Sequence, residues 1–370
     1  MLDKNKIFGF GCMRLPMIDD EVDNTEFSKM IKTFFDGGFS YFDTAHGYLG
    51  GKSELALKEC LTSKYPRDSY TITNKLTGNY FETEDDVIPF FNNQLEWCGV
   101  EYFDYYLMHA QNANNYEHFK KCKAYEQSIE LKKEGKIRHF GISFHDKASF
   151  LEKILIEYPE IEVVQIQLNY LDYEDPTVEG RKCYEICEKY NKEVIVMEPI
   201  KGGNLVNLPE DAMEIVKELN SGSPASLALR YVGGFDKVVM VLSGMNKLVE
   251  VEENISFMGN FEKLNEKEQD AIDKICAIFK SKNLIACTTC RYCVDGCPKK
   301  ILIPDLFSCL NTKKVFNDWN ANFYYGINTT KNGKASECIK CGKCEIVCPQ
   351  HLKITELLVD VASEFEQNKK

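Results

Sequence analysis

Nine of the sixteen cysteines in this chain lie between Cys287 and Cys348, and eight of these nine form two copies of the pattern Cys-x2-Cys-x2-Cys-x3-Cys-Pro. The first copy contains Cys287, Cys290, Cys293 and Cys297, and the second contains Cys338, Cys341, Cys344 and Cys348. Thiols gathered at short fixed spacings in a chain without signs of secretion indicate metal binding rather than disulfides. The other eight cysteines have no such spacing, and we expect them to be small buried hydrophobic residues.

This spacing is the one found in bacterial ferredoxins, where the fourth cysteine of each run ligates the other cluster. It predicts two [4Fe–4S] clusters with crossed ligands. One cluster takes Cys287, Cys290, Cys293 and Cys348, and the other takes Cys338, Cys341, Cys344 and Cys297. A pair of zinc sites is the alternative. Zinc ribbons usually present two Cys-x2-Cys pairs, so four cysteines followed by proline, twice, favour iron–sulfur.

Four other side chains could together handle a proton: Asp43, Tyr48, Lys75 and His109. A tyrosine with its ordinary pKa near 10 is a proton donor at neutral pH. An ammonium about 4 Å away is worth about 4 kcal/mol at an effective dielectric of about 20, which would lower the phenol pKa by up to about three pH units. We therefore expect Lys75 to lower the pKa of Tyr48. Asp43 would hold Lys75, and His109 would hydrogen-bond the substrate oxygen.

Each of these residues also has an ordinary structural explanation. Asp43 could cap the following helix, Lys75 could be a solvated charge, and Tyr48 could be an exposed loop aromatic. A single histidine such as His109 is more often structural than catalytic. The prediction of a site depends on all four falling at the ends of neighbouring elements.

Those elements are eight short segments rich in β-branched and aromatic residues, which alternate with longer segments of helical pattern. They lie at 7–13, 39–44, 70–75, 103–109, 137–143, 163–168, 194–198 and 238–243. Eight such units in about 260 residues predict a (β/α)8 TIM barrel, which typically has about 250 residues. Reactive groups of such barrels lie at the carboxyl ends of the strands, where Asp43, Lys75 and His109 fall.

A doubly wound sheet is the alternative architecture. Its dinucleotide fingerprint is missing, because Gly9-Phe10-Gly11 lacks the third glycine and precedes no obvious helix. We predict three parts: a barrel over 1–261, a connecting helix over 262–285, and a small, largely helical ferredoxin-like iron–sulfur domain over 286–370. The last part has 12 basic and 9 acidic residues, whereas residues 1–285 carry a net charge of −15.

The composition indicates a folded globular protein, with 44% hydrophobic and 28% charged residues. A net charge of −12 argues against nucleic acid and anionic membranes as partners. The first residues have no long apolar segment of the kind found in signal peptides, and no run of about 18 apolar residues could span a bilayer. We expect a soluble, cytoplasmic protein.

The first 260 residues resemble the aldo-keto reductases. The resemblance lies in Tyr41-Phe42-Asp43-Thr44-Ala45-x2-Tyr48, Ser53-Glu54, Thr73-Asn74-Lys75 and Asp104-Tyr105-Tyr106-Leu107-Met108-His109. It implies a barrel that uses NAD(P)H to reduce a carbonyl, or that oxidises an alcohol. The family's catalytic residues would be Asp43, Tyr48, Lys75 and His109. The cysteine-rich half resembles the ferredoxin-like domain of the iron–sulfur branch of this family.

The same resemblance implies cofactor contacts. Ser143 and Gln165 would hold the nicotinamide carboxamide, and the loops after the last two strands would hold the phosphates. The remaining contacts implied are Gly202, Gly203, Ser243, Gly244, Glu253 and Asn254. Relatives that prefer NADPH place Lys and Arg where this chain has Gly244 and Glu250. A carboxylate repels a 2′-phosphate, so we expect NADH to be preferred.

Together these features predict an NAD(P)H-dependent oxidoreductase acting on a small carbonyl or alcohol, with Tyr48 as general acid or base and two [4Fe–4S] clusters for electron transfer. Ferredoxin or another redox protein would be the partner. Hydride transfer moves two electrons, each cluster passes one, and no flavin motif is evident. Two alternatives therefore stay open: a reductase with structural or regulatory clusters, and an electron-transfer protein whose barrel binds a ligand or partner.

Overall fold

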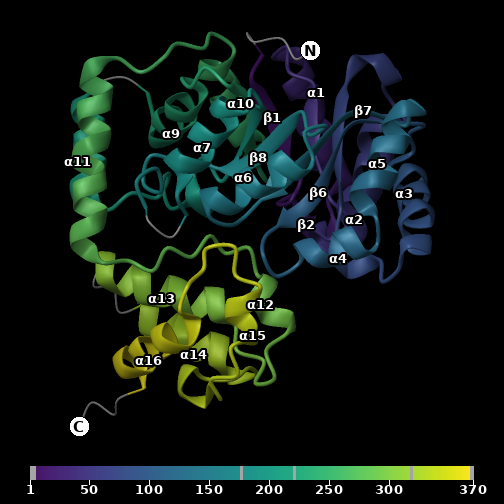
Figure 1. The fold of residues 1–370 in the computed structure, drawn as a ribbon. Helices are drawn as coiled ribbons and strands as arrows, with labels where there is room; N and C mark the ends of the chain where they lie inside the picture. Colours follow the sequence, from purple (N-terminus) through teal and green to yellow (C-terminus); the bar gives the residue numbers. More distant parts are fainter. Residues whose placement is uncertain (1–5, 176–177, 220–221, 317–319, 367–370) are drawn as a thin grey trace. The chain divides into compact units, whose positions relative to one another are not determined.

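The computed structural model describes residues 6–175, 178–219, 222–316 and 320–366. The chain divides into two compact units (Figure 1). The first contains Met1–Pro199 and Ala225–Leu264, and the second contains Ile200–Pro224 and Asn265–Lys370. Within the described residues, no helix combines the length and the apolar character needed to cross a membrane.

The first unit is built on a closed barrel of eight parallel strands in the order β1-β10-β9-β8-β7-β6-β5-β4. The strands are β1 (Phe8–Gly11), β4 (Tyr41–Asp43), β5 (Thr71–Leu76), β6 (Phe103–Gln111), β7 (Ile137–Phe144), β8 (Val163–Gln167), β9 (Glu193–Met197) and β10 (Val238–Gly244). Each predicted strand segment overlaps one of them, so the predicted barrel is confirmed and the doubly wound alternative is wrong. A small antiparallel hairpin of β2 (Met17–Ile18) and β3 (Glu21–Val22), which was not predicted, follows β1.

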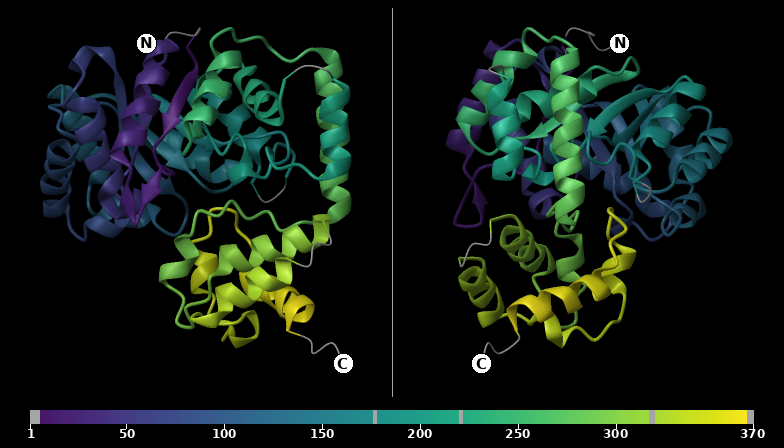
Figure 2. Two further views of the ribbon diagram at one scale, coloured as in Figure 1. Left: turned by 180° about the vertical axis from the view of Figure 1, so that it is seen from behind. Right: turned by 90° about the vertical axis from the view of Figure 1, so that its left-hand side faces the viewer.

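Helices surround the strands of the barrel (Figures 1 and 2). They are α1 (Asn24–Asp36), α2 (Lys52–Leu57), α3 (Glu84–Cys98), α4 (Tyr116–Lys121), α5 (Ala124–Lys133), α6 (Ala148–Glu157), α7 (Gly180–Lys189), α9 (Pro224–Gly233) and α10 (Leu248–Met258). Helix α1 shows how the sequence sets their bounds. The side chain of Asp23 accepts hydrogen bonds from the backbone N–H groups of Thr25 and Glu26, and apolar residues at helical spacing bury one face.

The register of the strands brings polar side chains to one end of the barrel. Asp43, the last residue of β4, pairs with Thr73 of β5. Lys75 lies two residues beyond Thr73 and pairs with Leu107 of β6, and His109 lies two residues beyond that. Side chains two residues apart on a strand face the same side, so this stagger places the polar groups near one another at the carboxyl ends.

The second unit is largely helical, as predicted. Its helices are α8 (Glu210–Glu218), α11 (Glu266–Lys282), α12 (Tyr292–Asp295), α13 (Ile303–Phe316), α14 (Asn320–Thr330), α15 (Lys343–Ile346) and α16 (Ile354–Phe365). Helix α11 falls within the predicted connector and begins with a reciprocal capping box between Asn265 and Glu268. Buried apolar residues of α13 and α16, such as Leu306 and Leu358, form the core of this unit.

The division differs from the predicted domain boundaries at one segment. Residues 200–224 were expected to belong to the barrel, but they belong to the second unit. The Nδ2 group of Asn204 donates to the carbonyl oxygen of Cys287 over 3.1 Å. An ion pair of 3.0 Å also joins Asp211 to Lys282 of α11. These contacts connect residues far apart in the chain, which a boundary drawn along the sequence does not reveal.

Candidate active site and iron–sulfur cluster sites

Lys75 is at the centre of the polar group at the end of the barrel. Its side chain is fully buried, and its Nζ donates to Oδ1 of Asp43 over 2.6 Å, to the carbonyl oxygen of Thr44 over 2.8 Å and to the phenol oxygen of Tyr48 over 3.2 Å. These three acceptors match the three protons of an ammonium. A buried ammonium is tolerated only when it is paired and hydrogen-bonded in this way.

Asp43 has a partner for each carboxylate oxygen. Oδ1 accepts from Lys75, and Oδ2 accepts from Nε2 of Gln165 over 3.0 Å. Burial raises the pKa of Asp43, while the charge and hydrogen bond of Lys75 oppose that rise. Burial in turn lowers the pKa of Lys75, and Asp43 opposes it. The two groups thus form an internal ion pair whose members stabilise each other's charge.

Tyr48 lies in a short 3-10 turn, Tyr48–Gly51, which follows β4. The pKa of this phenol is raised well above 10, first by burial and then by the negative charge of Asp43, whereas Arg14 lowers it. The expectation of a lowered Tyr48 pKa is therefore wrong in direction. Asp43 lies closer to Lys75 than Tyr48 does and offsets its charge. The phenol accordingly stays protonated at neutral pH, as a general acid must be.

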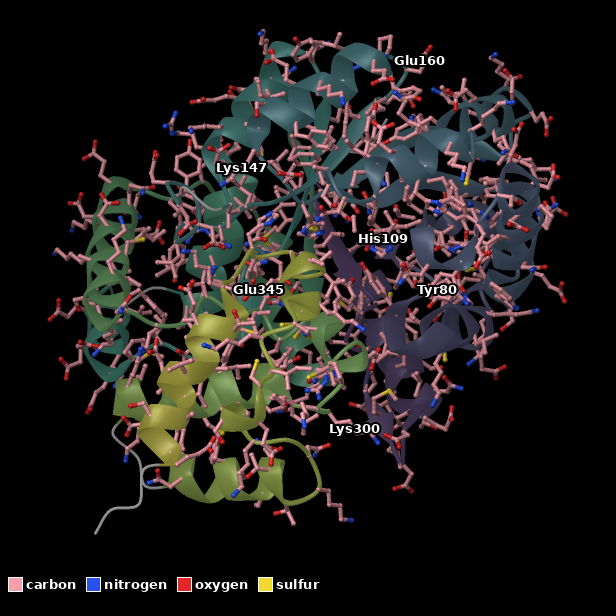
Figure 3. The ribbon with its side chains drawn as sticks, turned by 60° about the horizontal axis from the view of Figure 1, so that its bottom comes forward. Tyr80, His109, Lys147, Glu160, Lys300 and Glu345 are labelled. Atoms are coloured by element: carbon pink, nitrogen blue, oxygen red, sulfur yellow. The ribbon has the colours of Figure 1, made fainter. Side chains whose placement is uncertain are left out.

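His109 completes the group and is 7% exposed (Figure 3). Its ring centroid lies 5.9 Å from that of Tyr48 in an edge-on arrangement. Its Nδ1 lies 2.6 Å from Oγ1 of Thr77. Burial, the charge of Lys75 and His145 hold the pKa of His109 well below 6.5, so the ring is neutral at pH 7. A hydroxyl of Thr77 that donates to Nδ1 leaves the proton on Nε2, where it can be donated to a substrate oxygen.

A second buried network supports Lys75 from behind, and the sequence analysis missed its role. The fully buried Glu54 accepts from Nδ2 of Asn74 over 2.8 Å and from Nε2 of Gln94 over 3.1 Å. Asn74 then accepts from the backbone N–H of Lys75, and Gln94 donates to its carbonyl oxygen. Asn74 and Glu54 stood in the quoted motifs, but nothing in the sequence indicated that Gln94, on α3, joins them.

Two of the residues expected to contact the cofactor carry polar groups near this site. Oγ of Ser143 accepts from the backbone N–H of Ala110 over 2.7 Å, which leaves its hydroxyl proton to donate. Gln165 uses its amide nitrogen on Asp43, which leaves its carbonyl oxygen to accept. One donor and one acceptor are what a carboxamide requires, so these two residues fit a nicotinamide.

The other residues expected to contact the cofactor mainly contact other residues of the protein. Nδ2 of Asn254 on α10 donates to Oγ of Ser243 over 3.4 Å, which brings those two together. Gly244 ends β10, and the side chain of Arg14 lies beside it. Arg14 had not been singled out from the sequence. Glu250 accepts from the backbone N–H of Asn246, so it also has a structural role at the start of α10.

Of the remaining three, Glu253 lies on α10, whereas Gly202 and Gly203 fall in the second unit. Gly202 has a φ of +63°, and a Cβ built on it would lie 2.4 Å from the carbonyl oxygen of Thr288. Close packing against Thr288 therefore already requires glycine at this position. The expected approach to a pyrophosphate stays a prediction.

The eight motif cysteines surround two cavities in the second unit. Cys287, Cys290, Cys293 and Cys348 line one open cavity of about 310 Å³, together with apolar residues such as Phe307. Cys297, Cys338, Cys341 and Cys344 line the other, of about 330 Å³. The structure thus groups the thiols as crossed ligation requires. Among the described residues, no three His, Cys, Asp or Glu side chains converge closely enough for one metal ion. Four thiols spread around a cavity suit a multi-iron cluster.

Comparison with known proteins supports the predictions for both the barrel and the cysteine-rich half. Residues 8–277 match the model of the aldo/keto reductase family, and residues 286–353 match that of a 4Fe-4S dicluster domain. The second match favours iron–sulfur over zinc.

Two curated plant proteins are similar to the barrel. L-galactose dehydrogenase from Arabidopsis thaliana is 26% identical over 75% of this chain and 91% of its own length. The 7-acetyl-epi-neemfruitin B aldo-keto reductase from Melia azedarach is 26% identical over 73% of this chain and 85% of its own.

Solved structures share the fold. A Bacillus halodurans aldo-keto reductase has a TM-score of 0.60 and 24% identity, covering 73% of this chain and 91% of its own. A Klebsiella pneumoniae aldo-keto reductase in complex with NADPH has a TM-score of 0.59 and 17% identity, covering 73% of this chain and 90% of its own. Because the family model spans most of the sequence, this chain belongs to the aldo/keto reductase family, and it carries a 4Fe-4S dicluster domain at its C-terminal end.

Proposed function

We propose that the barrel reduces a small-molecule carbonyl with NAD(P)H, or oxidises the corresponding alcohol, with Tyr48 as the general acid or base. The observation that carries this proposal is the chain of contacts from Asp43 through Lys75 to the phenol of Tyr48, beside a neutral His109. A bound NAD(P)H supplies the hydride. Ser143 and Gln165 would hold its carboxamide.

His109 and Tyr48 both act on the substrate oxygen. Nε2–H of His109 and the hydroxyl of Tyr48 donate hydrogen bonds to the carbonyl oxygen and polarise it. As negative charge develops there, Tyr48 gives up its proton to form the alcohol. The tyrosinate left behind is stabilised by the ammonium of Lys75, whose Nζ already lies 3.2 Å away. Asp43 holds Lys75 in place and acts as a positioning residue.

The choice between the two nicotinamide cofactors rests on the residue types at Gly244 and Glu250, and Arg14 lies beside Gly244. Neither residue supplies the charged donors that a 2′-phosphate needs, and a carboxylate repels it. We therefore propose that NADH is preferred. Comparing kcat/KM for NADH and NADPH with one accepted aldehyde tests this, and a strong preference for NADPH would refute it.

We further propose that the second unit holds two [4Fe–4S] clusters with crossed ligands and that they exchange electrons with a redox protein. The supporting observation is the grouping of four thiols around each of two cavities. Such clusters need a reducing environment, and the described cysteines form no disulfide, so we place the protein in the cytoplasm. The alternative of structural or regulatory clusters predicts that Cys341→Ala still reduces aldehydes at the rate of the parent.

The central test is anaerobic purification with iron and sulfide analysis, followed by a carbonyl panel monitored through NAD(P)H absorbance. Tyr48→Phe should lose about 10²–10⁴-fold in rate, the usual contribution of general acid catalysis. Tyr65→Phe is the matched control, because Tyr65 packs against Phe35 away from the polar group. Full carbonyl reduction by Tyr48→Phe would overturn the proposal. No carbonyl reduction by the parent, with cluster reduction retained, would favour an electron-transfer protein instead.

A further inference from the structure

The two cluster sites differ in how they face solvent. Among the eight motif cysteines, Cys341 alone is exposed, and it belongs to the set that also contains Cys297, Cys338 and Cys344. Apolar side chains lie close to it in the chain, and they too are exposed: Ile339 is 57% exposed and Ile346 is 63% exposed. Exposed apolar groups beside a redox centre are the kind of surface that a partner protein covers.

Positive charge surrounds the same site. Residues 297–300 and 331–344 contain six of the twelve basic residues of 286–370, and their one acidic residue is Glu337. Lys299 and Lys343 line the cavity of this cysteine set, while Lys300 follows Lys299 and Lys340 precedes Cys341. We call the exposed residues Lys299, Lys300, Ile339, Lys340, Cys341, Lys343 and Ile346 the cluster-edge patch. None of its lysines forms an ion pair with another residue that the structure describes.

The other cluster site lacks the exposed lysines, although Tyr292 and Val347 beside its cysteines are also exposed. No described lysine or arginine lines its cavity. Arg291, the cation within its cysteine run, is held by both carboxylate oxygens of Asp305 at 2.9 and 3.1 Å. The asymmetry therefore lies within the second unit itself (Figure 3 labels Lys300 and Glu345 there).

We propose that the cluster-edge patch is the docking surface for an acidic one-electron carrier protein, which exchanges electrons with the cluster held by Cys297, Cys338, Cys341 and Cys344. This proposal rests on the electron-transfer role proposed above. Residues 297–300 and 331–344 carry a net charge of +5, whereas the rest of the chain carries −17. An acidic carrier is thus attracted at this site and repelled elsewhere, which both speeds and orients the encounter.

Each exchange is a one-electron step. A reduced carrier loses one electron, and the cluster passes from the 2+ to the 1+ state. A second carrier molecule supplies a second electron, so that both clusters are reduced. No proton or bond changes are required at the docking surface, which only has to bring the two centres within reach.

The test uses the full-length, iron-loaded protein under anaerobic conditions. The probe is an acidic flavodoxin in its hydroquinone form, whose oxidation to the semiquinone is followed by stopped-flow spectroscopy. Lys340→Glu/Lys343→Glu reverses the charge of the patch. Lys274→Glu/Lys280→Glu is the matched control, because it makes the same charge change at exposed positions of α11. Iron content and the electron paramagnetic resonance spectrum of the photoreduced clusters establish that each variant is loaded.

For the parent, the rate at low ionic strength should fall steeply as salt is added. The patch variant should be slower by at least about tenfold at low salt, the lower end of electrostatic steering, and the difference should vanish near 1 M salt. The α11 control should stay within about twofold of the parent. Oxidation of the reduced protein by ferricytochrome c, a basic carrier, should not be slowed by the patch reversal.

Equal slowing by both double variants, or a rate that is independent of salt, would overturn the proposal. So would tight binding of a single-stranded oligonucleotide that the patch reversal abolishes, since the surface would then serve nucleic acid. Carbonyl reduction with NAD(P)H is measured on the same samples. If carbonyl reduction proceeds while flavodoxin fails to react, the docking surface is wrong and the reductase proposal stands. If flavodoxin reacts as expected while no carbonyl is reduced, the docking surface stands and the reductase proposal is wrong.

Discussion

Asn204 donates a hydrogen bond of 3.1 Å to the carbonyl oxygen of Cys287, and it donates another of 2.8 Å to the carbonyl oxygen of Lys201. The segment that follows β9 is thereby attached to the first cysteine of the cluster region. Two residues before Asn204, the backbone of Gly202 packs against Thr288 with a left-handed φ of +63°. A loop expected to serve the nicotinamide cofactor is thus built into the unit that holds the thiols.

Gly202→Ala should therefore weaken the cluster held by Cys287. A Cβ there would lie 2.4 Å from the carbonyl oxygen of Thr288, and the left-handed backbone adds strain of about 1–3 kcal/mol. The measurement is the rate of iron release to a chelator, together with the midpoint of thermal loss of cluster absorbance.

Gly203→Ala is the matched control for this change. Its φ is also left-handed, at +99°, but the nearest atom to a built Cβ is the Asn207 side chain at 3.6 Å. Both variants carry backbone strain, and only Gly202→Ala carries the clash. Equal iron release from the two would mean that the contact with Thr288 contributes nothing to cluster retention.

Lys75→Met should both inactivate and destabilise the protein. It leaves the buried Asp43 without its counter-ion, and breaking such a pair costs about 3–5 kcal/mol of unfolding free energy. Urea unfolding of the barrel measures this loss.

Lys75→Met/Asp43→Asn removes both charges and should recover most of the lost stability without recovering carbonyl reduction. The comparison separates the two roles of Lys75, because stability depends on pairing and activity depends on the ammonium beside Tyr48. Recovery of activity in the double variant would show that the ammonium is not needed.

The pH dependence of the two reaction directions should differ. The pKa of Tyr48 is raised well above 10 and that of His109 is lowered well below 6.5, so the phenol is protonated and the imidazole is neutral throughout the neutral range. Carbonyl reduction should then have a flat kcat/KM between about pH 6 and 9. Alcohol oxidation needs the deprotonated phenol and should rise with pH across the same range. A break in the reduction profile near pH 6.5 would show that His109 titrates with an ordinary pKa.

The barrel was predictable from the sequence because each strand is a compact burst of β-branched and aromatic residues. Asp43, Lys75 and His109 could be singled out because those bursts end at or near them, and the structure places them near the carboxyl ends of β4, β5 and β6. The grouping of the motif cysteines followed from their spacing alone.

What the sequence did not reveal depends on burial and on distant contacts. The direction of the Tyr48 pKa shift required knowing that Tyr48 is buried and lies near the charge of Asp43. The place of residues 200–224 in the second unit depends on contacts such as that of Asn204 with Cys287, 83 residues away. Neither quantity has a local signature in the chain.

Glu54→Ala should reduce catalysis by disturbing the hydrogen bonds that hold the backbone of Lys75. Glu54 accepts from Asn74 and Gln94, and those two hold the backbone N–H and carbonyl oxygen of Lys75. Truncation also removes the carboxylate beside Nδ1 of His46, and it leaves the buried Nδ2 of Asn74 without an oxygen acceptor, which costs about 1–3 kcal/mol. Displacement of Lys75 should lower kcat more than it changes KM, because the ammonium acts on Tyr48 in the transition state.

Two comparisons make this last expectation decisive. Glu54→Gln keeps an oxygen for Asn74 and Gln94 and places an amide beside Nδ1 of His46, so it should retain most of the stability and of kcat. Gln127→Ala also removes side-chain hydrogen bonds, but at a partly exposed position in the first turn of α5, and should leave kcat unchanged. If Glu54→Ala lowers the unfolding free energy and yet keeps the parent kcat, the network stabilises the barrel without positioning Lys75.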